Sequence, residues 1–248
     1  MNYTLEICSN SAQSALNAQE AGATRVELCS SLWESGTTPS YGSIKKARAL
    51  LDIQLFVLIR PRGGDFIYSD LEFDIIKEDI IACKAMGVDG IVSGVLNKDN
   101  TIAMARTKEL IELSSPLPFT FHRAFDLTPN LFQSLENLIA LNVDRVLTSG
   151  GHENVTNASE IITNLNQLAE NKIVILPGGG INEANIKNLF YSGCTEFHLT
   201  GNEICKSSAQ KNVLHLNSTT SIPERDYFES SVEKIKKVVA QLKNHFKP

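Results

Sequence analysis

The chain has 248 residues, of which 42% are hydrophobic, and its formal net charge is −5, so it can bury the core of one large globular domain. Charges of both signs are interspersed without a basic stripe, which argues against nucleic acid as a partner. No apolar run approaches the ~20 residues that span a bilayer, and the first residues lack the pattern of a signal peptide, so we expect a cytoplasmic protein that does not bind membranes.

Short β-branched runs alternate with longer amphipathic segments along the chain. The runs predict strands at Leu5–Cys8, Arg25–Cys29, Leu55–Arg60, Gly90–Ser93, Phe119–His122, Arg145–Thr148, Ile173–Leu176 and Glu196–Leu199. The segments predict helices at Ser11–Glu20, Ser40–Leu51, Asp70–Met86, Ile102–Leu113, Asn130–Leu141, Ala158–Ala169, Asn182–Tyr191 and Ser230–Phe246. Strands that each precede a helix in this way predict an α/β fold of the TIM (β/α)8 barrel type. We expect residues 1–248 to form one such domain, with a long loop at 201–228 and a C-terminal helix at 230–246.

An internal repeat supports the barrel. The segments that begin at Ala21, Met86, Leu141 and Ser192 can be aligned, and each has Gly or Asn where a helix must stop, followed by an even-numbered strand. Barrel interiors are filled by layers of side chains from alternate strands. The alignment therefore predicts a lowest layer, for which we expect an ionic plug, and a second layer above it. The lowest layer holds Arg25, Gly90, Arg145 and Glu196, and the second holds Glu27 and His198.

Ionisable residues gather near the predicted strand ends, where barrels of this type place their chemistry. They are Glu6, Glu27, Arg60, Arg62, His122, Arg123 and His198. Burying these groups together is costly unless they pair with one another or bind something. We therefore predict a ligand site at the C-terminal mouth of the barrel.

Several loops at that mouth have the composition of an anion site. The first loop contains Arg60, Arg62 and Asp65, and Arg123 follows strand five. Guanidinium groups bind carboxylates and phosphates well. Glycine-rich ends follow strands seven and eight, at Gly178, Gly179, Gly180, Thr200 and Gly201. The run after strand seven leads into the helix predicted from Asn182, so backbone N–H groups and a helix N-terminus are expected to form a phosphate cradle there.

One hypothesis is an enzyme that acts on a small phosphorylated or carboxylated substrate. Glu6 or Glu27 would serve as the general base and His122 or His198 as the acid of an isomerase or lyase. The same four side chains are also suitable ligands for a divalent metal. The alternative is a purely structural role for these residues: a histidine hydrogen-bonded within the core, and a glycine triplet that makes a tight turn.

Six sequence blocks resemble the signature blocks of the CutC family, which is named for copper homeostasis. They begin at Glu6, Arg25, Gly36, Ile59, Phe121 and Val146, and the resemblance runs from the first strand to about Gly201. It implies a TIM-type barrel, a cytoplasmic location, a homo-oligomer and a Cu(I) site. By resemblance, the copper ligands are Cys8 and Cys29.

Physical chemistry leaves copper and the alternatives open. Cys8 and Cys29 each lie two residues beyond an inward glutamate on adjacent strands, so their thiols are expected to approach each other, and soft thiolates suit Cu(I). The glutamates would raise the thiol pKa values, and Arg60 and Arg62 would offset that effect. Cysteine is also a common core residue, and the five cysteines form no CxxC motif. The partner is thus a copper ion or a small anionic ligand, and the cofactor is copper, a divalent metal or none.

Overall fold

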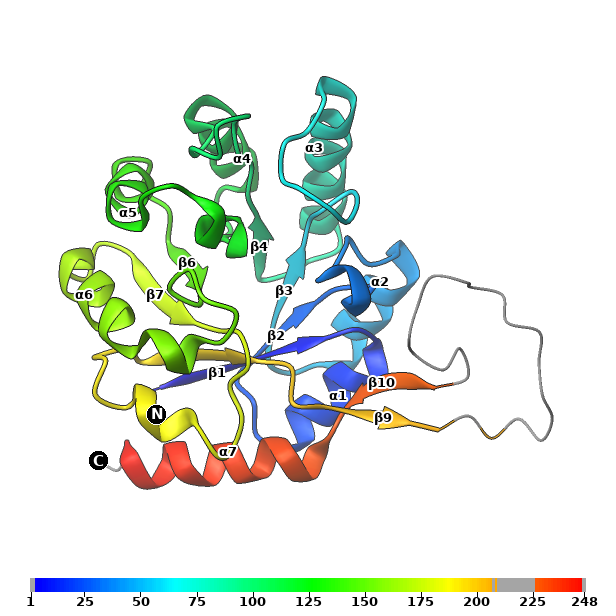
Figure 1. Ribbon diagram of the computed structural model, residues 1–248. Helices are drawn as coiled ribbons and strands as arrows, with labels where there is room; N and C mark the ends of the chain where they lie inside the picture. The colour runs from blue at the N-terminus through cyan, green and yellow to red at the C-terminus, as the bar shows by residue number, and fades with distance from the viewer. Residues whose placement is uncertain (1–2, 207, 209–225, 247–248) are drawn as a thin grey trace.

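The computed structural model describes residues 3–206, 208 and 226–246, and parallel strands form a barrel in this part of the chain (Figure 1). The strands are β1 (Thr4–Ser9), β2 (Arg25–Leu28), β3 (Gln54–Leu58), β4 (Gly90–Ser93), β5 (Phe119–Phe121), β6 (Arg145–Thr148), β7 (Val174–Pro177) and β8 (Glu196–Leu199). Hydrogen bonds join them in the order β7-β6-β5-β4-β3-β2-β1-β8. A parallel bridge between Gly178 and His198 joins the two outer strands. The predicted α/β barrel is therefore confirmed.

Helices pack around the outside of the barrel, as Figure 1 shows. They are α1 (Ala12–Glu20), α2 (Tyr41–Leu50), α3 (Asp70–Ala85), α4 (Met104–Ser114), α5 (Leu131–Ala140), α6 (Ser159–Ala169) and α7 (Val232–His245). Short 3₁₀ helices follow β2, β5, β6 and β7, at Leu32–Glu34, Arg123–Leu127, Val155–Ala158 and Ile186–Leu189. Within the described residues, none of the helices has both the length and the apolar character needed to cross a membrane.

The repeat inferred from the sequence marks where the chain turns from helix to even-numbered strand. Gly22, Gly87 and Gly193 have φ values of 95°, 74° and 79°, and Asn142 occupies the corresponding position with φ 56°. Glycine and asparagine tolerate this left-handed conformation better than other residues. The four positions therefore end each preceding segment at the same point, which sets the same register for the strands that follow.

The lowest layer of the barrel is the ionic plug that the repeat predicts. Arg25 and Arg145 both pair with Glu196, and Nε of Arg145 lies 2.7 Å from its Oε2 atom. The ring of Phe56 lies beneath both guanidinium groups, with 4.7 Å and 5.3 Å from its centroid to their Cζ atoms. A Cβ atom on Gly90 would lie 2.5 Å from this ring. Glycine at this position therefore makes room for the phenylalanine that supports the charges.

The helix predicted at Asn182–Tyr191 is wrong, because this segment contains only the 3₁₀ helix Ile186–Leu189. The asparagine side chains take the place of helical hydrogen bonds. Oδ1 of Asn182 accepts from the backbone N–H of Ala184, and Oδ1 of Asn185 accepts from that of Asn182. Such local side-chain bonds compete with helix formation. The glycine run after β7 therefore does not lead into a helix N-terminus.

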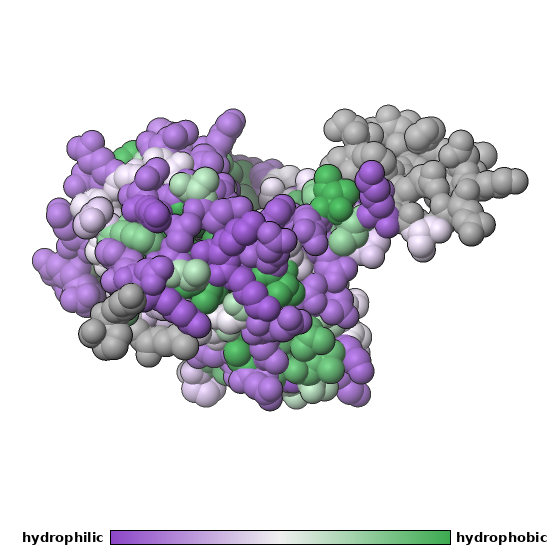
Figure 2. Space-filling view, turned by 90° about the horizontal axis from the view of Figure 1, so that it is seen from below, coloured by the Kyte–Doolittle hydropathy of each residue, from purple (hydrophilic) through white to green (hydrophobic). Residues whose placement is uncertain are grey.

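The predicted loop at 201–228 contains regular structure at both ends. Strands β9 (Asn202–Cys205) and β10 (Tyr227–Ser230) form an antiparallel hairpin that extends away from the barrel in Figure 1. The ring of Phe228 packs on Trp33, with 4.4 Å between centroids. Residues 207 and 209–225 of this loop lie outside the described residues. Seen from below, hydrophilic residues cover most of the surface, with hydrophobic residues scattered among them (Figure 2).

Candidate functional site

A cavity of about 450 Å³ opens at the C-terminal ends of the strands. The predicted site residues in its lining are Cys8, Glu27, Arg60, His122, Arg123, Gly179, Gly180, His198 and Thr200. The other predicted site residues, Glu6, Cys29, Arg62, Asp65, Gly178 and Gly201, are not part of this lining. The structure thus brings polar groups from β1, β2 and β8, and from the segments that follow β3 and β5, to one cavity, as expected for the mouth of a barrel.

Glu6 is fully buried and connects the ionic plug to the cavity. Its Oε2 atom accepts from Nε of Arg25 at 2.5 Å, and its Oε1 atom accepts from Nδ1 of His198 at 2.7 Å. Both contacts follow from strand register, because Glu6 pairs with Arg25 on β2 and with His198 on β8. Burial raises the pKa of Glu6, but Arg25 and His198 outweigh it and lower the pKa to about 2. Glu6 therefore orients His198 as a carboxylate.

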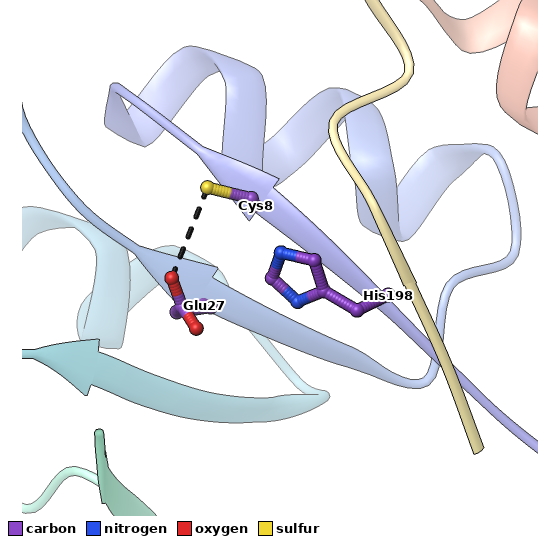
Figure 3. Close-up of side chains that lie close together, drawn as sticks. All are labelled: Cys8, Glu27 and His198. Atoms are coloured by element: carbon purple, nitrogen blue, oxygen red, sulfur yellow. Dashed lines mark hydrogen bonds between the residues drawn. The ribbon is translucent and has the colours of Figure 1, made fainter. Parts of the chain in front are cut away.

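Cys8 lies close to Glu27 and His198, as Figure 3 shows. Its Sγ atom is 3.5 Å from Sγ of Cys29 and 3.8 Å from Oε1 of Glu27. Cys8 lines the cavity, whereas Cys29 is 1% exposed and lies behind it. The approach of the two thiols expected from the sequence is confirmed, and only one of them faces the cavity.

The three residues drawn in Figure 3 have strongly shifted pKa values. The hydrogen bond to Cys29 and burial raise the pKa of Cys8 well above its usual value. Burial raises the pKa of Glu27 to about 7. For His198, burial lowers the pKa, but hydrogen bonds to Cys8 and Glu6 and the nearby carboxylates outweigh burial and raise it well above its usual value. The site therefore holds protons at neutral pH that a metal ion would displace.

His122 stands opposite this group, just after β5, and is neutral. Its Nδ1 atom accepts from the backbone N–H of Ala124 at 3.3 Å, so the ring proton is on Nε2. Burial and the charge of Arg60 lower the pKa of His122 to about 3. Nε2 is buried and has no hydrogen-bond partner among the described residues. His122 therefore offers the cavity a donor without a charge.

Arg60 also lines the cavity, but it is held firmly by the surrounding loops. Its terminal nitrogens donate to the backbone carbonyls of Glu34, Gly36 and Gly64 at 2.5 to 2.7 Å. Its Nε atom is buried and has no partner within the part of the chain that the structure describes. Its Cζ atom lies 4.8 Å from the centroid of Phe66. The Nε–H of this guanidinium is thus left without an acceptor among the described residues.

Arg62 and Asp65 bind each other and the start of α3. Nε of Arg62 donates to Glu72 at 2.5 Å, and its Nη2 atom donates to Asp65 at 3.0 Å. Glu72 belongs to the capping box of α3 with Ser69. These two residues, predicted to bind an anion, therefore stabilise the loop outside the cavity. The sequence of this loop did not distinguish that role from ligand binding.

Arg123 lies at the rim of the cavity, where Asp126 holds it. Nε of Arg123 donates to Oδ2 of Asp126 at 2.8 Å, and the same carboxylate accepts from Thr148 at the end of β6 and from Ser149 just after it. Asp126 lines the cavity and is a site residue that the sequence interpretation did not include. The spacing of three residues between Arg123 and Asp126 could have predicted this pair, because it brings side chains together in one helical turn.

The predicted glycines have different structural roles. A Cβ atom on Gly178 would lie 2.6 Å from Leu147, so glycine here allows the barrel to close. Gly179 and Gly180 have φ values of 104° and 76° and pass close to Arg123 and Asn154. Gly201 packs against Ile235 of α7 and lines a separate cavity.

The residues at the floor of the cavity form a suitable donor set for a metal ion. Donor atoms of Cys8, Glu27 and His198 all lie within 4.8 Å of one another. Oε2 of Glu27 is buried without a hydrogen-bond partner among the described residues, as expected for an atom awaiting a ligand. Cys29 adds a second sulfur next to Cys8. Sulfur, imidazole and carboxylate ligands suit late transition metals rather than magnesium or calcium.

The fold and site define a class of protein: an α/β barrel with a thiol, imidazole and carboxylate cluster at the floor of its C-terminal mouth. The model of the CutC family matches residues 3–203 of this chain. The chain therefore belongs to the CutC family.

Relatives agree with this assignment. The human copper homeostasis protein cutC homolog is 39% identical over 245 residues, which is 98% of this chain and 90% of the human protein. A CutC family protein of Chromobacterium violaceum is 46% identical over 199 residues, or 80% of this chain and 81% of that protein. The crystal structure of a CutC protein from Streptococcus agalactiae superposes with a TM-score of 0.76 at 35% identity, covering 80% of this chain and 98% of the other. The structure of QR15, described as an aldolase, superposes with a TM-score of 0.62 at 12% identity, which shows a shared fold alone.

Proposed function

We propose that this protein binds Cu(I) through Cys8 and Cys29, with His198 as a third ligand, and serves copper homeostasis. The observation that carries the proposal is the 3.5 Å separation of the two Sγ atoms, together with the His198 imidazole, which lies near Cys8. Thiolates are soft ligands that select Cu(I) over harder ions. The copper homeostasis names of the human and mouse relatives support the same choice.

The separation of the sulfurs is compatible with one shared metal ion. Metal–thiolate bonds are about 2.3 Å long, so two sulfurs on one ion lie no more than about 4.6 Å apart. The observed 3.5 Å is within this limit. Since Nδ1 of His198 bonds Glu6, Nε2 is the nitrogen that would bind the ion. Cys8 faces the cavity, which gives the ion a route to the pair.

Titration of the reduced protein with Cu(I), in the presence of a competing chelator, tests this proposal. The wild-type protein is expected to bind one tight equivalent, and the Cys8→Ser/Cys29→Ser double variant none. The matched control is Cys83→Ser/Cys194→Ser, which also replaces two buried cysteines but leaves the cavity unchanged. Unchanged tight binding by the Cys8 and Cys29 double variant would contradict the proposal.

A second candidate function is favoured by the size of the cavity. About 450 Å³ is more than an ion requires and falls in the range of small-molecule sites. Glu27, with its pKa of about 7, is suited to transfer a proton at neutral pH. Glu6 is less suited, because both its oxygens are bonded and its pKa is about 2. We therefore propose Glu27 as the general base and His122 as the hydrogen-bond donor of an isomerase or lyase.

Hydrogen exchange tests this second function. Small carboxylic acids and sugar phosphates are incubated with the protein in D₂O, and loss of carbon-bound proton signals is followed by NMR. The enzyme hypothesis predicts exchange in at least one compound, with at least a 100-fold slower rate in Glu27→Gln. Exchange that persists in Glu27→Gln would contradict the assigned base.

We also propose a cytoplasmic, homo-oligomeric protein. The free cysteines suit a reducing compartment. The side chains of Trp33, Ile204 and Tyr227 are exposed on the β9–β10 hairpin and the loop beside it, where a second copy would cover them. Light scattering coupled to gel filtration is expected to give a multiple of 27.2 kDa, and a mass of 27.2 kDa would contradict the assembly.

A further inference from the structure

Two buried N–H groups belong to residues that line the cavity and have no hydrogen-bond partner among the described residues. They are Nε of Arg60 and Nε2 of His122. Phe66 packs against both side chains, at 4.8 Å from Cζ of Arg60 and 4.7 Å from the ring of His122. A buried donor left without an acceptor loses its hydrogen bond to water and gains none in return. Two such donors in one cavity therefore indicate a ligand that supplies acceptors.

Both donors are fixed in place before a ligand arrives. The backbone N–H of Ala124 holds the His122 ring through Nδ1, so Nε2 carries the proton. Carbonyl groups of Glu34, Gly36 and Gly64 hold the other nitrogens of Arg60. Together the donors supply two N–H groups and one positive charge. Such preorganised donors bind a complementary anion with little ordering cost.

We infer that the cavity binds a small organic monocarboxylate, with its two carboxylate oxygens on Nε of Arg60 and Nε2 of His122 and its carbon chain directed toward Glu27. This inference rests on the second candidate function, because it names the substrate class of that site. A carboxylate has one negative charge and two acceptor oxygens, which match these two donors and the one positive charge that they carry. The apolar side chains of Leu58 and Leu147 line the same cavity and suit a short carbon chain.

A phosphorylated ligand fits the cavity less well. A phosphate monoester carries a charge of about −1.5 to −2 and three acceptor oxygens, more than these two donors and one cation satisfy. The phosphate cradle expected after β7 needs a helix N-terminus, and this segment has only the 3₁₀ helix Ile186–Leu189. Asn182 and Asn185 also bind the carbonyl of Gly180 and so shape this loop from within the protein.

Glu27 lines the same cavity as the two donors. Oε2 of Glu27 is the third buried atom of the cavity without a partner among the described residues. The two N–H donors, on Arg60 and His122, follow β3 and β5, and Glu27 belongs to β2. A short acid held by Arg60 and His122 would thus share the cavity with the side chain of Glu27.

Calorimetric titration of the full chain, freed of metal with a chelator, tests the inference. The probes are acetate, lactate and pyruvate, with inorganic phosphate as the comparison at equal ionic strength. At least one carboxylate is expected to bind 10-fold or more tightly than phosphate. His122→Asn keeps an acceptor for the N–H of Ala124 but lacks Nε2, and is expected to weaken carboxylate binding at least 10-fold.

Further variants keep the result interpretable. Arg60→Lys keeps the charge and lacks Nε, and is expected to weaken carboxylate binding at least 10-fold. It replaces His122→Asn in the test if that variant does not fold. Arg62→Gln removes a guanidinium outside the cavity and is expected to bind carboxylate like the wild type. Tighter phosphate binding, or unchanged carboxylate binding in folded His122→Asn, would overturn the inference.

The outcomes also separate this inference from the second candidate function. If phosphate binds best and a sugar phosphate shows exchange that depends on Glu27, the enzyme function stands and the carboxylate assignment fails. If no probe binds and no compound exchanges, both fail. Cu(I) titration of the same His122→Asn sample is expected to match the wild type, because His122 is not among the proposed copper ligands.

Discussion

Nδ1 of His198 lies 2.7 Å from Oε1 of Glu6, although the two residues are 192 positions apart in the chain. The other oxygen of Glu6 binds Arg25 of the ionic plug. A carboxylate that holds the second nitrogen of a metal-binding histidine fixes both its orientation and its tautomer. The ionic plug and the proposed copper site are therefore one connected structure.

This connection predicts the effect of Glu6→Gln on copper. The amide neither fixes the Nδ1–H tautomer as strongly nor balances Arg25, so Cu(I) affinity is expected to fall 10- to 100-fold. The free energy of unfolding is expected to fall by about 3–5 kcal/mol, because a buried ion pair loses one partner. Chelator competition and urea unfolding measure the two effects. Glu203→Gln on exposed β9 is the matched control, and equal copper affinities in the two variants would argue against the link.

A second prediction concerns pH and stability. Burial raises the pKa of Glu27 to about 7, so its contribution to stability is complete below the unfolded pKa of about 4.3 and is lost as the pH rises through 7. Glu27→Gln removes the buried charge, and at pH 8 the variant is expected to be more stable than the wild type by on the order of 3 kcal/mol. Urea unfolding from pH 5 to pH 8 checks this. If the wild type is as stable as Glu27→Gln at pH 8, or more stable, the buried-charge explanation is ruled out.

A third prediction concerns pH and copper affinity. The pKa values of Cys8 and His198 are both raised well above their usual values, by the Cys29 hydrogen bond and burial for Cys8 and by Cys8, Glu6 and Glu27 for His198. Cu(I) must displace their protons, so the apparent affinity is expected to rise about 10-fold per pH unit for each proton released. Competition titrations at pH 6, 7 and 8 measure this slope. Affinity independent of pH would mean that these groups do not bind the ion.

A fourth prediction compares two glycines. Gly90→Ala places a Cβ atom 2.5 Å from the ring of Phe56 and is expected to destabilise the fold by about 1–3 kcal/mol. Gly42 in α2 has no atoms within 4 Å of an added Cβ, so Gly42→Ala is expected to stabilise the fold by up to about 1 kcal/mol. Thermal unfolding of the two variants compares them. A neutral Gly90→Ala would mean that Phe56 does not need this space.

The sequence predicts the barrel well because its repeat fixes strand register. Gly22, Gly87, Asn142 and Gly193 mark equivalent chain turns, and their alignment brings Arg25, Arg145 and Glu196 together as expected. Residues two apart on a strand point the same way, so the approach of Cys8 to Cys29 also follows from the pattern.

Loop contacts and buried pairings are less accessible from sequence. Arg60 and Arg62 look equivalent in the chain, yet one is held by backbone carbonyls inside the cavity and the other by Glu72 outside it. This difference depends on the path of the loops, which no periodicity encodes. The segment 182–191 has apolar residues at helical spacing, but local asparagine hydrogen bonds override that pattern.

The central claim is that one Cu(I) ion is bound between Cys8, Cys29 and His198. Anomalous diffraction at the copper absorption edge, from crystals of the reduced protein loaded with Cu(I), locates the ion directly. The account predicts one strong peak bonded to both Sγ atoms and to Nε2 of His198. A strong peak only at Cys205 or elsewhere on the surface, with none at the floor of the cavity, would contradict it.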